Sequence, residues 1–124
     1  MKFLSIYKTK ESGGPPCQEE IAKMGKLIEE GMKAGYLLGV EGCLPSALGA
    51  RVRRSNGRLN VTDGPFTEAK EIVGGYAQFD LKSKQEAVDS AVRFMELHKK
   101  HWPGWEGETE VRQMFGPEEF PPKT

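Results

Sequence analysis

The residues of this sequence best suited to chemistry lie in one turn, between Thr62 and Phe66. The run Arg58 to Val61 has the composition of a short strand and leads directly into Asp63, a glycine and a proline. Gly64 precedes a proline and is biased toward turn geometry, and Pro65 cannot donate a backbone hydrogen bond, so strand pairing ends there. Functional groups gather on such turns, because a rigid strand positions them while the loop keeps them accessible. Residue types alone also allow Asp63 to do no more than close the turn through its side chain.

Two histidines and two cysteines are the other reactive side chains. His98 and His101 share one side of a predicted helix, as in half of a metal site, but the sequence offers no third ligand close to them. We therefore favour a solvated helix end and expect no bound metal. Cys17 and Cys43 are too few for a disulfide framework or a cysteine-built zinc site, so we expect two reduced thiols. The sequence also lacks a phosphate-loop spacing and a nucleophile motif, and we expect no cofactor.

Length and charge narrow the class of protein. A chain of 124 residues fits one domain. Its 18 basic and 18 acidic residues give a formal net charge of zero, whereas nucleic-acid-binding proteins usually carry a basic excess. The first residues contain only a short apolar stretch before Lys8, which is shorter than the core of a signal peptide and far shorter than a membrane span. We therefore expect a cytoplasmic protein with no nucleic-acid or membrane partner.

The elements that must position the candidate residues follow from the spacing of apolar side chains. Alternation predicts a strand over residues 3–7 that is apolar on both faces, with Leu4 and Ile6 on one face and Phe3 and Tyr7 on the other. Residues 18–33 predict an amphipathic helix, followed by Gly35 where a C-terminal glycine is expected. The side chains expected to be buried on this helix are Ile21, Met24, Leu27, Ile28 and Met32.

The second half of the chain shows the same order of elements. Residues 72–81 predict a strand, and Gly74-Gly75 near its start permits a bulge or a close backbone approach. Ser83-Lys84-Gln85-Glu86 is a capping box that opens a second helix. The side chains expected to be buried on that helix are Ala87, Val88, Ala91, Val92, Phe94 and Met95.

Between the two halves lies a predicted β-hairpin. Asn56-Gly57 separates residues 50–55 from residues 58–62, and this dipeptide favours a two-residue type I′ turn. The turn sets a register in which Ser55 pairs with Arg58, Arg53 with Asn60 and Val52 with Val61. In that register Asp63 falls on the apolar face of the hairpin, near Ala50.

Strands at 36–40 and 110–115 complete the order β-α-β, hairpin, β-α-β. This order indicates one ferredoxin-like α+β domain over residues 1–115, with an antiparallel sheet and both helices on one face, followed by a tail at 116–124. Because the strands are apolar on both faces and two helices cover only one, we expect a homodimer. The rigid aromatic turn Trp102 to Trp105 is expected to pack on the domain or on the partner subunit, with a lid over a ligand as the alternative.

Several segments together resemble the signature of the YCII-related, DGPF-domain family. The resemblance is carried by Asp63-Gly64-Pro65-Phe66, by the following Thr67-Glu68-Ala69-Lys70-Glu71 and by Gly74-Gly75-Tyr76. The segments Arg51-Val52-Arg53 and Trp102-Pro103-Gly104-Trp105-Glu106-Gly107 resemble a subset of that family. The resemblance implies a dimeric α+β barrel, in which two such sheets pack together and leave pockets near the interface.

The resemblance also implies a reaction class. Related dimeric barrels include lactone isomerases and dehydrochlorinating enzymes, whose chemistry is proton transfer on small organic acids. Some members pair an aspartate with a histidine of the first helix, but residues 21–33 of this chain contain no histidine. Asp63 is thus the candidate catalytic residue without that partner. The candidate substrate-binding residues are Arg51, Arg53, Gly64, Pro65, Phe66 and Tyr76, with Glu68 and Lys70 as further candidates.

Three functional hypotheses remain open at this point. The first is an isomerase-like or lyase-like enzyme, or a small-molecule-binding protein, with a pocket near Asp63. The second is a non-catalytic accessory or regulatory protein, because family members are often encoded beside extracytoplasmic-function sigma factors. The third is a structural homodimer in which the turn motif serves folding alone. A ligand beside Asp63 would favour the first, and a stable complex with a sigma factor would favour the second.

Overall fold

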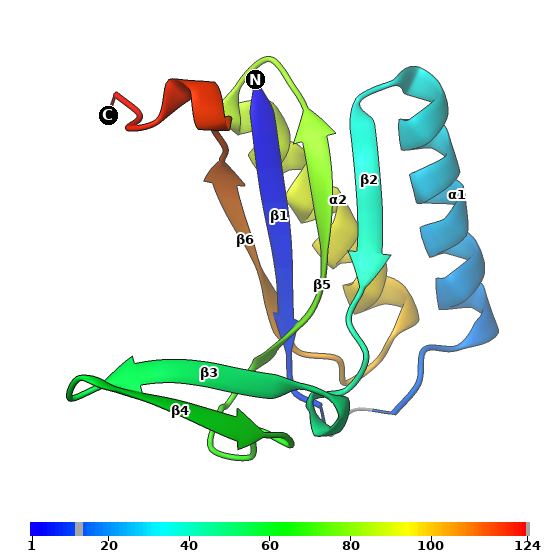
Figure 1. The fold of residues 1–124 in the computed structure, drawn as a ribbon. Helices are drawn as coiled ribbons and strands as arrows, with labels where there is room; N and C mark the ends of the chain where they lie inside the picture. The colour runs from blue at the N-terminus through cyan, green and yellow to red at the C-terminus, as the bar shows by residue number, and fades with distance from the viewer. Residues whose placement is uncertain (12–13, 124) are drawn as a thin grey trace.

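The computed structural model describes residues 1–11 and 14–123 of the chain (Figure 1). Within these residues the fold is α+β, with two α-helices and six strands. The strands are β1 (Lys2–Thr9), β2 (Leu37–Gly42), β3 (Ala50–Ser55), β4 (Arg58–Asp63), β5 (Ile72–Asp80) and β6 (Gly107–Gln113). The helices are α1 (Gln18–Ala34) and α2 (Lys84–His101), with short 3-10 turns at Ser46–Leu48 and Pro117–Glu119.

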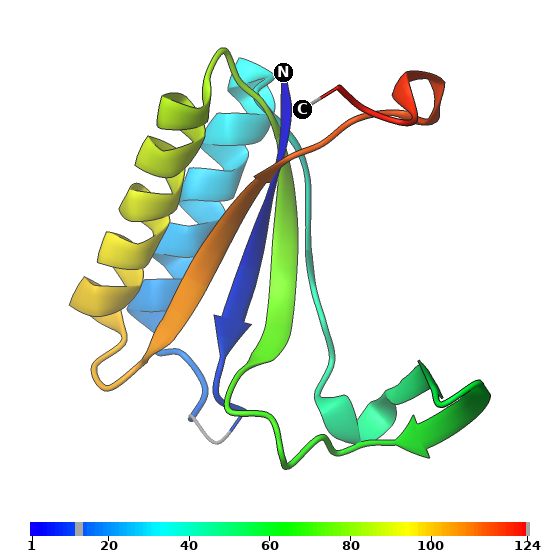
Figure 2. The same cartoon turned by 90° about the vertical axis from the view of Figure 1, so that its left-hand side faces the viewer.

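Four strands form one antiparallel sheet in the order β2-β5-β1-β6. Together with the two helices, this order is consistent with the ferredoxin-like fold expected from the sequence. Both helices cover the same face of the sheet, and the opposite face is left open (Figure 2). The last strand begins at Gly107, three positions before the predicted start at residue 110, and the predicted tail contains a short 3-10 turn.

The core lies between the sheet and the helices. The buried apolar side chains are Phe3, Leu37, Ala77, Phe79 and Ala87. The alternation predicted for the first strand is confirmed, because Phe3 is buried and Tyr7 stacks on Phe94 of α2 with ring centroids 4.2 Å apart.

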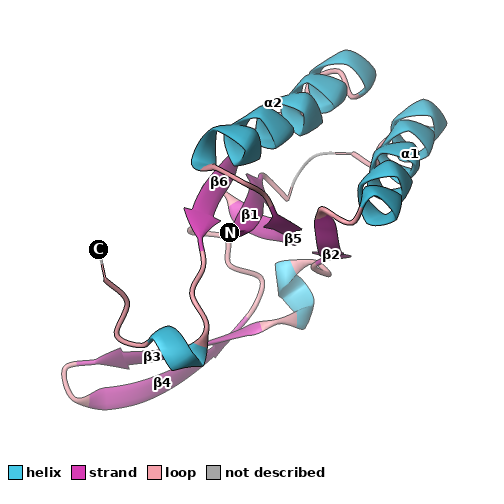
Figure 3. Ribbon diagram, turned by 90° about the horizontal axis from the view of Figure 1, so that it is seen from above, coloured by secondary structure: helices cyan, strands magenta, loops and turns pink. Residues whose placement is uncertain are grey.

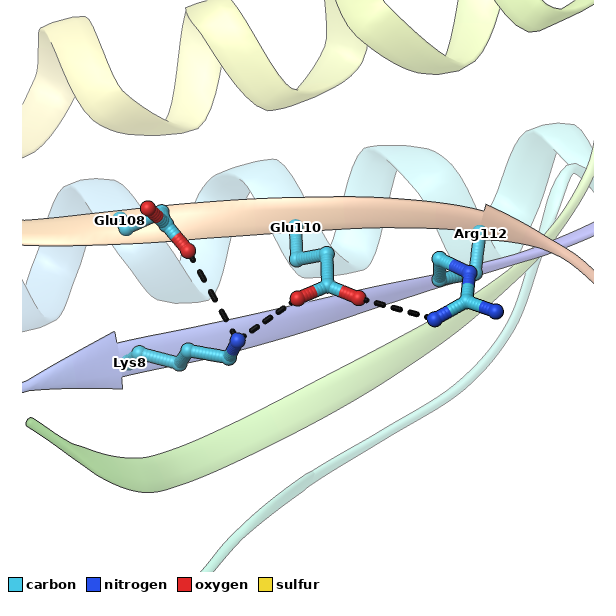
Figure 4. A network of polar contacts seen from close by, with 4 residues as sticks. All are labelled: Lys8, Glu108, Glu110 and Arg112. Carbon is cyan, nitrogen blue, oxygen red and sulfur yellow. Dashed lines mark hydrogen bonds and ion pairs between the residues drawn. The ribbon is translucent and has the colours of Figure 1, made fainter.

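The open face carries charges along one side as well as apolar residues. Lys8 of β1 lies 2.6 Å from Glu110 and 3.7 Å from Glu108, both on β6 (Figure 4). Arg112 continues this network with a 3.1 Å contact to the other oxygen of Glu110. The Lys8 ammonium and the Arg112 guanidinium lower the pKa of Glu110 through hydrogen bonds. A network of largely exposed ion pairs such as this one adds little stability.

Glycines at the start of β5 produce the predicted bulge. The pairing between β1 and β5 shifts after Tyr7, so that Tyr7 faces Gly75 while Lys8 faces Val73. Gly75 is also a point of close backbone approach, since a β-carbon there would lie 2.7 Å from the carbonyl oxygen of Glu41. Both effects suggested by the Gly74-Gly75 pair are therefore confirmed.

The strands β3 and β4 form a separate two-stranded sheet with the predicted register. Asn56 and Gly57 have φ angles of 52° and 74°, as a type I′ turn requires. The hairpin projects from the base of the main sheet, on the side away from the helices (Figures 2 and 3). Its apolar side chains are strongly exposed: Val52 at 70%, Leu59 at 73% and Val61 at 70%.

Both helices begin and end largely as predicted. Gly35 adopts the left-handed conformation at the end of α1, with φ of 84°, and Ser83 caps α2 by accepting a hydrogen bond from the Glu86 N–H. The buried face of α1 was predicted incorrectly at its borders, because Ile21 and Met32 are 54% and 50% exposed. A β-carbon at Gly31 would lie 2.9 Å from Leu37 Cβ, so this glycine allows α1 to approach β2 closely. The buried stripe therefore runs through Gly31 and Glu20.

The second helix also differs from its prediction at one border, because Val92 is 47% exposed. Val92 lies beside a cleft between α2 and β6 rather than under the helix. Across residues 1–11 and 14–123, no helix has the length and apolar character needed to cross a membrane.

Candidate functional site

A cavity of about 420 Å³ lies between the sheet and the two helices. Strands β1, β2 and β5 form its floor, and α1 and α2 form its walls. Its lining is predominantly apolar, with a few polar side chains. The apolar and aromatic lining includes Tyr7, Met24, Leu27, Ile28, Tyr36, Leu37, Val40, Ala77, Phe79, Phe94 and Trp105, and the polar lining includes Thr9, Glu41, Ser90, Arg93 and His98.

One end of the cavity is formed by His98 and the aromatic turn that follows α2. The imidazole is only 5% exposed, which corrects the prediction of a solvated helix end. Its ring lies 4.2 Å from the Phe94 ring, 4.5 Å from Trp105 and 5.6 Å from Trp102, measured between centroids. The turn from Trp102 to Trp105 therefore packs against the domain, which is one of the two packing positions expected from the sequence. Its two indole rings lie against His98.

Glu20 of α1 meets His98 in this buried environment. Its side chain is 1% exposed, and one carboxyl oxygen lies 3.1 Å from Nδ1 of His98. The same nitrogen lies 3.1 Å from the carbonyl oxygen of Phe94. A carbonyl oxygen can only accept, so Nδ1 carries a hydrogen and donates it to Phe94. Within residues 1–11 and 14–123, neither oxygen of Glu20 then has a hydrogen-bond partner.

Burial shifts the ionisation of Glu20, His98 and Tyr7. Burial raises the pKa of Glu20, and the charge of His101 lowers it in part. Burial lowers the pKa of His98, with a smaller opposing effect from the Phe94 carbonyl. Burial raises the pKa of Tyr7 to about 12, so its hydroxyl remains protonated at neutral pH. Burial thus favours the uncharged form of both Glu20 and His98. Shifted pKa values of this kind are typical of groups that exchange protons.

Neighbouring contacts at the surface join the same two helices. Nδ1 of His101 lies 3.4 Å from Glu19, and the Cys17 thiol donates to the backbone carbonyl of His101 at 3.1 Å. Cys17 and Cys43 are both free thiols, as predicted. Among the residues described, no group of three or more His, Cys, Asp or Glu side chains is arranged to hold a metal ion.

Replacing Glu20 by glutamine is expected to raise the free energy of unfolding at pH 7.5 by about 1 kcal/mol, because a neutral amide is less costly than a buried carboxylate without a donor. The pKa of Glu20 is raised in the folded state, so the wild type loses stability as pH rises from 4.5 through that raised pKa. The gain should therefore shrink toward pH 4. Urea denaturation of both proteins at several pH values measures this difference in the free energy of unfolding.

The matched control for this prediction is Glu19→Gln, because the Glu19 side chain is 65% exposed. This variant should change stability little at any of these pH values. A Glu20→Gln protein less stable than the wild type at pH 7.5 would instead indicate a stabilising charged pair with His98.

The Asp63 turn lies elsewhere, at the base of the hairpin. Asp63 is exposed and pairs with Ala50, as the register predicted. In the part of the chain that the structure describes, its carboxylate has no hydrogen-bond or ion-pair partner. The side chain therefore closes no turn here, and it lines none of the cavities described.

The rest of the motif is fixed by a local network around Ser46. Gly64 donates its N–H to the Gly49 carbonyl at 2.9 Å, and a β-carbon on Gly64 would overlap the Ser46 carbonyl oxygen. The Phe66 N–H donates to Ser46 Oγ at 3.1 Å. The buried Ser46 in turn donates to Glu11, and these hydrogen bonds lower the pKa of Glu11.

The other predicted site residues are only partly brought together. The Arg51 guanidinium lies 3.9 Å from the centroid of the Phe66 ring and forms an ion pair with Glu68. Arg53 is exposed on the opposite face of the hairpin from Asp63, as is its partner Asn60. Tyr76 lies on the open face of β5, opposite Ile6. The structure therefore groups Arg51, Gly64 and Phe66, whereas Tyr76 belongs to the main sheet.

Comparison with known proteins places these features in a family. A family model described as a YCII-related domain matches residues 1–95. The chain belongs to the YCII-related family. The YCII-related match covers α1 with Glu20 and the hairpin with Asp63, and it ends before His98.

The chain is also similar to an uncharacterized protein of Rhizobium meliloti (strain 1021). The two are 40% identical over 60 residues, which is 48% of each chain. The chain thus spans about half the length of the curated relative it matches. This similarity assigns no activity to the YCII-related domain.

Proposed function

We propose that this YCII-related domain binds a small, largely apolar molecule in the cavity between its sheet and its helices, and that it acts as an isomerase-like or lyase-like enzyme of the proton-transfer type. The observation that carries the proposal is the cavity itself. Its volume of about 420 Å³ lies in the range of ligand pockets, roughly 300–1,000 Å³. A mostly apolar lining with a few polar groups at defined places is typical of such pockets.

Binding is expected to be lost when the cavity is filled. Ser90 of α2 lines the cavity and is half-buried. A Ser90→Trp side chain would occupy ligand space, whereas Ser90→Ala keeps that space. In a thermal-shift screen with small hydroxy, keto and lactone acids, some ligands should raise the melting temperature of the wild type and of Ser90→Ala. The same ligands should leave the melting temperature of Ser90→Trp unchanged. Hits of equal size on all three proteins would place the ligand outside the cavity.

The Asp63 turn is a second candidate site, and the same screen tests it. Its carboxylate is exposed while the turn around it is held by Ser46 and Gly49, which supports a role as an accessible acid–base group. Asp63→Asn should leave the melting temperature of the free protein unchanged and should abolish binding of ligands that depend on the charge. Hits that shift Asp63→Asn and the wild type equally would remove Asp63 from the site.

We further propose that the domain forms a homodimer through its open sheet face and its hairpin. A two-stranded hairpin is marginally stable by itself, and this one exposes three large apolar side chains at 70% or more. A second copy that covers this face would remove that area from water. Light scattering after gel filtration should give about twice the chain mass of 13.8 kDa.

A matched pair of variants on β4 tests the contribution of the hairpin to the dimer. Val61→Lys places a charge on the apolar face, and Asn60→Lys places the same charge on the opposite face. The first should weaken the dimer and the second should not. A wild type that remains a monomer at micromolar concentration would contradict the proposal. A regulatory association with a sigma factor remains the alternative, and it would be seen as a stable complex on co-purification.

A further inference from the structure

The chemistry of the cavity depends on which nitrogen of His98 is free. Nδ1 donates its hydrogen to the Phe94 carbonyl, so the lone pair of the neutral imidazole is on Nε2. His98 lines the cavity, and its neighbours Phe94 and Trp105 line it as well. The histidine therefore offers a neutral base beside a predominantly apolar cavity lining.

Glu20 is placed to act on this base rather than to hold the helices together. A structural clasp would satisfy its own hydrogen bonds, yet both oxygens of this fully buried carboxyl lack a donor among the residues described. The contacts of His101 with Glu19 and Cys17 already join the two helices nearby. A carboxyl group 3.1 Å from Nδ1 would, however, stabilise an imidazolium as soon as His98 gained a proton.

We propose that His98 is the catalytic base and Glu20 its positioning residue for proton transfer from an acidic C–H bond of a small 2-keto acid with an apolar side chain. This inference rests on the proposed binding of a ligand in the cavity. It assigns the reaction to two residues on different helices, neither of them in the Asp63 turn.

The step balances without any co-reactant. Nε2 of His98 takes the proton from the carbon next to the keto group, and the C–H electron pair becomes the carbon–carbon double bond of an enolate. The imidazolium forms an ion pair with the ionised Glu20. Return of the proton to the enolate oxygen gives the enol, and its return to carbon restores the keto form. The net reaction is a tautomerisation.

The ligand class follows from the charges at the cavity. Arg93 is the one arginine or lysine in the described lining, and it is exposed. It precedes His98 by five residues on α2, which corresponds to about 7.5 Å along the helix axis. A carboxylate at Arg93 would place an adjoining keto group inside the cavity, toward His98. Glu41 also lines the cavity, from β2, and it disfavours ligands with two acidic groups.

Phenylpyruvate is the probe for the test. It combines an aromatic group, a keto group and one carboxylate, and exchange of its methylene protons in D₂O is followed by NMR. The wild-type protein should accelerate this exchange over buffer. His98→Gln, which keeps an amide to donate to Phe94, should reduce the acceleration about 100-fold or more. Both proteins should still bind phenylpyruvate in the thermal-shift assay.

Glu20→Gln gives a second readout that does not depend on the fold of the His98 variant. It should slow exchange about tenfold and shift the acidic limb of the pH profile to lower pH, because the imidazolium loses its counter-charge. The other titratable or charged groups in the described cavity lining are Tyr7 from β1, Tyr36 before β2, Glu41 from β2 and Arg93 from α2. Glu19 from α1 and His101 from α2 lie beside the pair, and all of these groups are unchanged in this variant.

The outcomes separate this inference from the binding proposal. Binding of phenylpyruvate without accelerated exchange, or equal exchange by wild type and His98→Gln, would overturn the catalytic pair and leave the cavity as a binding site. An unshifted pH profile in Glu20→Gln would remove Glu20 from the mechanism. A wild type that binds other acids of the screen but not phenylpyruvate would overturn the substrate class.

Discussion

Gly64→Ala is expected to lower the free energy of unfolding by at least about 3 kcal/mol or to detach the hairpin base from the domain. A β-carbon at this position would overlap the Ser46 carbonyl oxygen and would crowd the Ala47 amide nitrogen at 3.2 Å. Both neighbours are backbone atoms, which cannot move aside as a flexible side chain can. Gly64 also donates to the Gly49 carbonyl, so the two segments would have to separate. Urea denaturation and amide hydrogen exchange measure the loss.

The control is a glycine that has room for a side chain. A β-carbon on Gly25, in the interior of α1, would meet nothing within 4 Å. Gly25→Ala should therefore stabilise the protein by up to about 1 kcal/mol through helix propensity. If Gly64→Ala were as stable as the wild type, the close packing of the Asp63 turn on Ser46 would be refuted, and with it the structural role of the motif.

Phe3→Ala is expected to cost about 3–5 kcal/mol, because the ring is 1% exposed and its loss leaves a void in the core. The core contains few fully buried side chains, so little neighbouring material can collapse into that void. The effect should not depend on protein concentration, because Phe3 faces the helices of its own chain. Chemical denaturation at two protein concentrations tests both statements.

Leu4→Ala is the comparison for Phe3→Ala, because the adjacent residue points to the open face of the sheet and is half-buried there. In a monomer this change should cost much less than the loss of Phe3. In the proposed dimer the cost should shrink as the protein is diluted, since Leu4 would then contribute to association and the dimer dissociates at low concentration. Equal and concentration-independent losses for the two variants would argue against the assigned faces of β1.

The sequence predicted those features that local rules determine. The Asn56-Gly57 turn specified the hairpin, its register and the placement of Asp63 beside Ala50, because two left-handed residues leave few alternatives. Helix ends were also predictable, since Gly35 and Ser83 satisfy backbone groups within their own segments. The alternation in the first strand indicated which of its residues would be buried.

The buried pair at the cavity was not predictable from the same rules. Glu20 lies on the buried face of α1 together with Gly31, which lets the helix approach β2, and no spacing in the sequence marks that face. His98 carried a weaker signal. It follows Phe94 by four residues and precedes Trp102 by four, so the three rings share one helical face, which indicates burial rather than a solvated end. The contact between Glu20 and His98 depends on how α1 and α2, which are distant in the sequence, pack together.

The strand order β2-β5-β1-β6 has a consequence for how the protein can fold during its synthesis. Every strand of the main sheet pairs only with strands from the other half of the chain, since β1 lies between β5 and β6 and β2 pairs with β5. The first half therefore leaves the ribosome with two strands that have no partner. Among the described strands, only β3 and β4, which are joined by two residues, can pair as soon as they emerge. Assembly of the sheet must wait for β5, so the growing chain exposes β1 and β2 until Asp80 has emerged.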